Sequence, residues 1–279
     1  MADITLPSGN TIPNLGLGTW YMGEGRSGRQ QEVDALRFGI EYGARLIDTA
    51  EMYGEGEAER ITGDAMQGLR DHVYLVSKFY PHNAGYRQVI QACERSLQRL
   101  QTDHIDLYLL HWRGSVPFNE TLEALYQLQK DGKILEYGVS NLDVDDMEEF
   151  DQYDIKGLCA TDQVLYNLAR READFALKPF LDQRNISMMA YCPLDQGGLL
   201  KDRLLNQIAQ AHQATPAQIA LAWLLQRPGV IAIPKSSHQD RVKENLDAAN
   251  IQLSASEITL LDEAYPVPQS ARQARIHVR

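Results

Sequence analysis

Short apolar runs recur along the chain, and their spacing constrains the fold more than any other feature of the sequence. Most runs lie about 30 residues apart, the length of one strand–helix–strand unit. The eight runs begin at Leu15, Leu46, Val73, His104, Glu136, Ala160, Ser187 and Val230. Runs such as VYLVS and LYLLH are almost continuously apolar, which is typical of parallel strands covered on both faces.

The segments between these runs have the period of a helix. After Gly85, one face collects Val89, Ala92, Cys93, Ser96, Leu97 and Leu100. Two further helical patterns, from Lys201 and from Pro216, precede the last run, so one helix is additional. Eight such units predict a closed (β/α)8 TIM barrel, with an open doubly wound sheet as the alternative. We expect one barrel domain over residues 1–279.

The two ends of the chain depart from this repeat. Around Ser8-Gly9-Asn10 the sequence predicts a β-hairpin that covers the floor of the barrel. After Glu263 the segment YPVPQSARQARIHVR has little periodicity, which predicts a short irregular tail.

Charge and cysteine content narrow the function classes. The net charge of −11 disfavours nucleic acid and membrane surfaces as partners. No apolar run is long enough to span a bilayer and no secretory signal is visible, so we expect a cytoplasmic protein. Three cysteines without a CxxC pair, Cys93, Cys159 and Cys192, are interpreted as small core residues, and the histidines have no spacing suited to a metal. The expected partner is a small molecule, and the expected state is a monomer.

Polar residues gather at the carboxyl ends of the predicted strands. They are Asp48, Lys78, His111, Ser140, Asn141, Gln163, Tyr191 and Lys235. In a barrel these ends share one rim, where barrel active sites form. Taken singly, Asp48 is explained as a helix cap, Lys78 as an exposed residue and His111 as a core histidine. Their coincidence at three successive strand ends favours a site.

This combination suits the protonation of a carbonyl oxygen. A neighbouring ammonium such as Lys78 stabilises the phenolate form of Tyr53 and is expected to lower its pKa. Asp48 keeps that ammonium charged in a partly dry pocket. His111 donates a hydrogen bond to a substrate oxygen that gains negative charge.

The group that attacks the carbon must come from elsewhere, because no thiol or serine is paired with a base. A hydride from a nicotinamide fits best. Lys235, Ser236, Ser237 and Arg241 surround a predicted helix start and form a candidate phosphate cradle. A capped surface helix with solvated charges is the alternative. The chain has no GxGxxG before a helix, so a Rossmann site is not expected.

These motifs together resemble those of the aldo-keto reductases, which are NADPH-dependent (β/α)8 barrels. The resemblance runs over nearly the whole chain, through GLGTW, DTAEMYG, LVSK, DLYLLHW, YGVSN, DQVLYN, YCPL, IPKSS and ENLDA. It implies an aldehyde and ketone reductase that uses NADPH. It also implies a catalytic tetrad of Asp48, Tyr53, Lys78 and His111, with Tyr53 as the general acid.

The resemblance extends to the binding residues. It places Ser140, Asn141 and Gln163 on the nicotinamide carboxamide and Tyr191 on its ring. It assigns Lys235, Ser236 and Arg241, beside Ser237, to the 2′-phosphate, Glu244 and Asn245 to the adenine, and Pro193 and Leu194 to the loop over the pyrophosphate. The substrate side comprises Gly18, Thr19, Trp20, Tyr53, His111 and Trp112, and the first three of these also border the cofactor.

Two departures from the family pattern bear on substrate and lid. The loop after Pro193 reads LDQGGLL, and the tail, which helps to shape the substrate pocket in this family, is short. A wide pocket for small aldehydes, α-dicarbonyls or keto-sugars is therefore expected. Two other functions stay open at this point: a sensory barrel that holds NADPH with little turnover, and a lyase that forms a Schiff base on Lys78.

Overall fold

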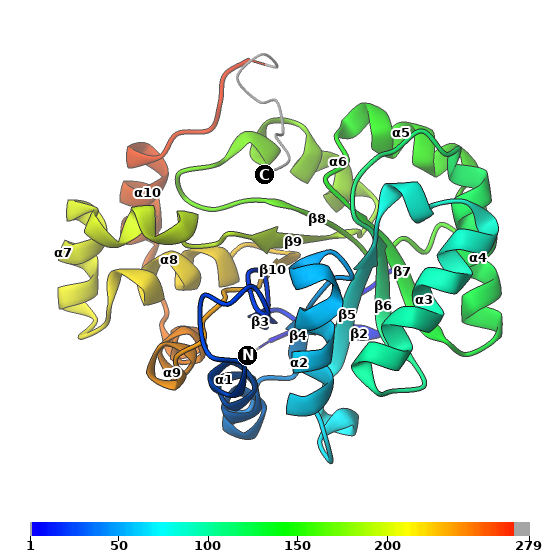
Figure 1. Cartoon of the computed structure of the whole chain (residues 1–279). Coiled ribbons are helices and arrows are strands. Elements are labelled where there is room, and N and C mark those ends of the chain that lie inside the picture. The colour runs from blue at the N-terminus through cyan, green and yellow to red at the C-terminus, as the bar shows by residue number, and fades with distance from the viewer. Residues whose placement is uncertain (1, 271–279) are drawn as a thin grey trace.

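The structure, a computed structural model that describes residues 2–270, is built around a sheet of eight parallel strands (Figure 1). In order they are β3 (Leu17–Gly18), β4 (Leu46–Asp48), β5 (Tyr74–Phe79), β6 (Ile105–Leu110), β7 (Ile134–Ser140), β8 (Thr161–Leu165), β9 (Ser187–Tyr191) and β10 (Val230–Ala232). Parallel bridges from Leu15 to Ala232 and from Gly18 to Lys235 join the first and last strands. The sheet therefore closes, and the predicted (β/α)8 barrel is confirmed.

Helices cover the outside of this barrel (Figure 1). They are α1 (Arg29–Tyr42), α2 (Glu57–Ala65), α3 (Tyr86–Leu100), α4 (Phe118–Lys130), α5 (Val144–Tyr153), α6 (Leu177–Gln183), α7 (Arg203–Ala211), α8 (Pro216–Leu225), α9 (Gln239–Asp247) and α10 (Ala255–Ala264). The buried face of α3 is the one that the periodicity predicted. Two helices, α7 and α8, precede β10, which confirms the additional helix.

An antiparallel hairpin closes the floor of the barrel. Its strands are β1 (Asp3–Thr5) and β2 (Thr11–Pro13). The Ser8 hydroxyl and the Asn10 amide both donate to Glu136 Oε1, at 2.8 and 2.6 Å. Glu136 lies near the start of β7 and is buried, so these bonds fix the hairpin to the end of the barrel opposite the rim, as predicted.

The structure bears only in part on the expectations about membrane spans, the C-terminal tail and the number of domains. None of the helices within residues 2–270 is long and apolar enough to cross a bilayer. Most of the predicted tail, from residue 271 on, lies outside the described residues. The single-domain assignment over residues 1–279 stays a prediction.

Candidate active site

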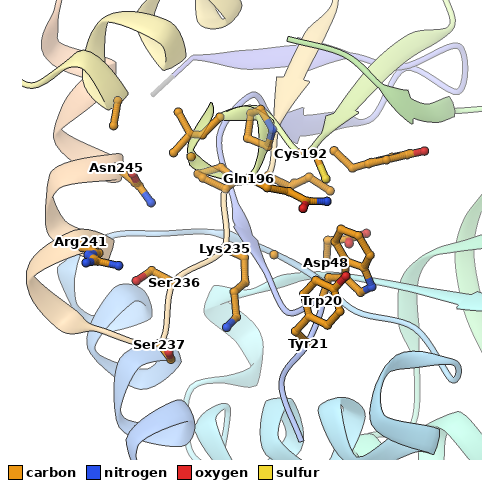
Figure 2. Close-up of a pocket in the computed structure, with 18 of the residues that line it drawn as sticks. Trp20, Tyr21, Asp48, Cys192, Gln196, Lys235, Ser236, Ser237, Arg241 and Asn245 are labelled. Carbon is orange, nitrogen blue, oxygen red and sulfur yellow. The ribbon is translucent and has the colours of Figure 1, made fainter. Parts of the chain in front are cut away.

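A cavity of about 1000 Å³ lies at the carboxyl ends of the strands. Most of the predicted site residues line it: Gly18, Trp20, Asp48, Tyr53, His111, Trp112, Ser140, Asn141, Gln163, Tyr191, Pro193, Leu194, Lys235, Ser236, Ser237, Arg241, Glu244 and Asn245. In Figure 2, Arg241 and Ser236 lie on one side, Trp20 and Asp48 on the other, and Lys235 between them. The volume is at the upper end for ligand pockets, so the cavity has room for an extended ligand.

Two predicted residues do not line the cavity but lie beneath it. Thr19 is buried, and its hydroxyl donates to the Asp48 carbonyl oxygen at 3.0 Å. Lys78 is fully buried below Asp48 and Tyr53. Both residues therefore support the cavity wall in this structure and do not form its surface.

The Lys78 ammonium joins the polar groups of the cavity floor. Its Nζ lies 2.8 Å from Asp48 Oδ1 and 2.9 Å from Oδ2, and it also donates to the Thr49 carbonyl oxygen at 2.9 Å. A further bond of 3.2 Å reaches the Tyr53 hydroxyl. A buried charge is stable only when such partners are present. Lys78 therefore links the carboxylate to the phenol.

The chain after β4 explains why Tyr53 reaches this position. Glu51 N donates to the Lys78 carbonyl oxygen, so the chain continues to pair with β5 beyond the end of the strand. It then turns, and Tyr53 N donates to the Ala50 carbonyl oxygen at 3.2 Å. Gly54 follows with φ 55°, a left-handed conformation that favours glycine. The five-residue interval between Asp48 and Tyr53 is thus filled by a turn back over the rim.

The protonation state of Tyr53 differs from the expectation. Burial, and then the Asp48 charge, raise the pKa of Tyr53 well above 10. The predicted lowering by Lys78 is therefore wrong for the protein without ligand, because desolvation of the phenolate outweighs the ammonium. Burial likewise lowers the pKa of Lys78, whereas Asp48 raises it. The cavity floor therefore contains a phenol that keeps its proton at neutral pH.

His111 forms one wall of the cavity next to Tyr53. The two rings meet edge to face, with centroids 5.7 Å apart, and Trp112 packs against the imidazole at 4.8 Å. Burial, and then the charge of Lys78, lower the pKa of His111 well below 6.5. Its buried Nδ1 meets no partner among residues 2–270. The imidazole is therefore neutral and can donate one hydrogen bond to a ligand.

A connected shelf of polar side chains lies opposite. The Tyr191 hydroxyl donates to Asn141 Oδ1 at 2.9 Å, and Asn141 Nδ2 donates to the His111 carbonyl oxygen at 3.1 Å. Asn141 has φ 59°, an uncommon conformation that concentrates at functional sites. The Ser140 hydroxyl donates to the backbone carbonyl of Gln163 at 2.7 Å. Three strands thus present one surface to the cavity.

The other end of the cavity carries unpaired positive charge. Lys235 and Arg241 form no ion pair with any residue that the structure describes. Burial lowers the pKa of Lys235, as expected for an ammonium without a close acceptor. Ser236 lies beside them, and α9 begins here without a side-chain cap. Cations, a hydroxyl and free helix amides form a site for phosphate.

Several lining residues escaped the sequence analysis. Arg26 lies with its guanidinium 3.4 Å from the centroid of the Tyr21 ring, in the loop between β3 and α1. The Ser27 and Ser237 hydroxyls, 2.8 Å apart, join this loop to the segment after β10. The remaining new contributors are Met52, Gln196, Gly197, Leu200, Thr215, Pro216, Ala217, Ile233, Pro234 and His238. The glycines around Arg26, in GEGRSG, were the available sign of an irregular loop near the rim.

Cys192 corrects one expectation. Cys93 and Cys159 are buried, as predicted for core residues. Cys192, in contrast, is half-buried and lines the cavity. The reason is local, since Cys192 has φ 49° where the chain leaves β9, which turns it out of the strand pattern.

A closed barrel with polar side chains gathered at the carboxyl ends of its strands is the architecture of barrel enzymes. The Aldo/keto reductase family model matches residues 14–266, and the chain belongs to this family. Its relatives include the methylglyoxal reductase YeaE of Escherichia coli, 50% identical over 93% of both chains. The glyoxal reductase of Bacillus subtilis is 35% identical over 93% of this chain and 91% of that protein.

Solved structures agree with this assignment. An aldo-keto reductase from Klebsiella pneumoniae in complex with NADPH has a TM-score of 0.94 and 46% identity, and each chain is fully covered. A second structure from that organism, in complex with NADP and acetate, has a TM-score of 0.93 and 48% identity over 99% of each chain.

Proposed function

We propose that this protein is an NADPH-dependent reductase of small aldehydes and α-dicarbonyls, and that methylglyoxal is among its substrates. The observation that carries the proposal is the Lys78 ammonium, which is shared between Asp48 and Tyr53 directly beneath the cavity. The names of the methylglyoxal and glyoxal reductases among its relatives support the substrate class.

The donor set of the cavity fits NADPH. Lys235, Ser236 and Arg241 would hold the 2′-phosphate, with Ser237 close by, and Glu244 and Asn245 would contact the adenine. Ser140, Asn141 and Gln163 would hold the nicotinamide carboxamide, and Tyr191 its ring. Arg26 adds a third cation on the opposite lip, suited to the remaining phosphates. When bound, the cofactor supplies the hydride that reduces the carbonyl carbon.

The chain's own residues supply the proton and the orientation. Tyr53 keeps its proton until a carbonyl oxygen gains negative charge above it, and then donates it. Lys78 stabilises the phenolate that remains, and Asp48 keeps Lys78 charged. The neutral imidazole of His111 donates a hydrogen bond to the same oxygen.

The substrate end of the cavity is lined by aromatic side chains. Trp20, Met52 and Trp112 line the cavity around Tyr53 and His111. Flat, small dicarbonyls can contact these rings while one oxygen reaches the phenol. The proposed substrates are therefore short aldehydes in preference to long apolar ketones.

The direct test is a panel of methylglyoxal, glyoxal, simple ketones and keto-sugars, each assayed with NADPH and with NADH. We expect the highest kcat/KM for an α-oxoaldehyde with NADPH. Absence of turnover with every carbonyl, together with measurable NADPH binding, would overturn the proposal in favour of a sensory barrel. Mass measurement in solution would test the predicted monomer, and the cytoplasmic location stays a prediction.

A further inference from the structure

The side chain of Gln163 crosses the mouth of the barrel to reach Asp48. Gln163 lies on β8 and Asp48 on β4, four strands away in a closed ring of eight. The Gln163 Nε2 donates to Asp48 Oδ1 over 2.7 Å. Both side chains are almost completely buried. The bond therefore spans the barrel between two side chains that solvent scarcely reaches.

The Asp48 carboxylate accepts from two donors, Gln163 Nε2 at Oδ1 and Lys78 Nζ at Oδ2, and Oδ1 also lies within ion-pair distance of Lys78. Lys78 Nζ lies 2.8 Å from the same oxygen that receives the Gln163 amide. The hydrogen bond from the Gln163 amide stabilises part of the carboxylate's negative charge. The carboxylate therefore attracts the Lys78 ammonium less strongly. Lys78 is then able to keep its bond to the Tyr53 hydroxyl. The amide thus influences how the ammonium is divided between carboxylate and phenol.

The other atom of the same amide is available to a ligand. No residue in the described range 2–270 donates a hydrogen bond to Gln163 Oε1, and Gln163 lines the cavity. Its backbone is held by Ser140 and Asn141, which donate to the Gln163 carbonyl oxygen at 2.7 and 2.9 Å. One rigidly held amide therefore faces Asp48 with its nitrogen and can accept from a ligand amide with its oxygen.

We propose that Gln163 is a positioning residue for the Asp48–Lys78 pair, in addition to the cofactor contact proposed for it above. Its amide nitrogen orients Asp48, and through Lys78 it sets the hydrogen bond on Tyr53. This inference rests on the proposed reductase function. Proton donation by Tyr53 then depends on a side chain that the cofactor also contacts.

The decisive variant is Gln163→Glu, which keeps the length and replaces the donor. When ionised, the introduced carboxylate would face Asp48 with a second negative charge, whereas its protonated form would donate to Asp48 as the amide does. The ratio of variant to wild-type kcat, at saturating NADPH and aldehyde, should therefore rise as the pH falls. We expect a loss of about 10- to 100-fold at alkaline pH that largely disappears at acid pH.

Matched variants separate this role from simpler ones. Tyr53, His111, Tyr191 and Cys192 lie around this pair and are unchanged in the variant, so the ratio to wild type removes the pH dependence that the two proteins share. Asn141→Asp places a carboxylate on the proposed nicotinamide shelf without contacting Asp48. Its main effect should be a higher KM for NADPH, and its kcat ratio at saturating NADPH should change with pH much less than that of Gln163→Glu.

Gln163→Met tests the same inference without an added charge, and it can be used if the glutamate variant does not fold. It removes the donor without adding a charge, so its kcat should fall at every pH with no recovery in acid. A kcat ratio for Gln163→Glu that is flat with pH, or wild-type kcat in Gln163→Met, would overturn the inference. Either result in an enzyme whose wild type reduces aldehydes leaves the proposed function intact, whereas an inactive wild type contradicts that function itself.

Discussion

The two ends of the cavity differ in whether their charged side chains are paired. At the β4–β5 end, Lys78 and Asp48 are buried and bonded to one another. At the β10–α9 end, Lys235 and Arg241 are more exposed and form no ion pair within residues 2–270. A buried charge needs a partner within the protein, because it has lost its hydration. An exposed cation is hydrated by water and is stable without an anion. The proposed proton donation thus relies on buried, paired charges, and the proposed nucleotide binding on more exposed cations.

The largest expected effect comes from breaking the buried end. Lys78→Met removes the ammonium and leaves the Asp48 carboxylate buried without its charge partner. We expect kcat to fall by about 10² to 10⁴ and the free energy of unfolding to fall by about 3–5 kcal/mol. Steady-state kinetics and urea unfolding would measure the two losses.

A double variant sharpens that result. Lys78→Met with Asp48→Leu removes both charges, so stability should recover to a large extent while activity should not. Recovery of activity in the double variant would contradict the role given to the ion pair.

The exposed end should respond differently. Arg241→Ala should weaken NADPH binding by about 10-fold or more, since a bidentate contact to phosphate is lost. NADH has no 2′-phosphate, so its binding should change little, and the fold should remain stable. Titration with both cofactors is the measurement, and equal losses for the two would exclude a 2′-phosphate contact.

The buried end also predicts a pH dependence of stability. Burial and Lys78 lower the pKa of His111 in the folded protein, whereas the unfolded chain takes up a proton near pH 6.5. Stability should therefore be lost as the pH falls below about 6.5, by up to about 1.4 kcal/mol per pH unit. His111→Gln should lose less than wild type between neutral and mildly acidic pH in denaturant unfolding. The same substitution at His72, an exposed histidine outside the cavity, is the matched control.

The smallest effect is expected in the loop between β3 and α1, which carries Arg26. Arg26 is exposed and stacks on Tyr21, so Arg26→Ala should weaken NADPH and NADH alike by about threefold. A loss confined to NADPH would place Arg26 on the 2′-phosphate. Arg26→Lys, which keeps the charge, should recover part of the binding.

The same contrast explains what the sequence could predict. Strand ends are fixed by periodicity, so the approach of Asp48, Lys78 and His111 followed from eight apolar runs. The positions of Arg26 and Cys192 depend on turns with positive φ angles. The hydrophobic period of the sequence does not predict such turns. Their places on the cavity were missed for that reason.

The sequence also does not show which of two opposing contributions to a pKa is the larger. The prediction for Tyr53 considered the nearby ammonium but not the full burial of the phenol, which raises its pKa. The Gln163–Asp48 bond also escaped notice, because it joins residues 115 positions apart across the barrel. Neither a spacing nor a motif reports which side chains meet over the barrel axis.

The division between a catalytic core and a binding surface is tested most directly by Tyr53→Phe. This variant removes one hydroxyl at the buried end and leaves every cation of the exposed end in place. The account predicts an unchanged Kd for NADPH and a kcat lowered by about 10² or more. Near-normal turnover with the same Kd would contradict it.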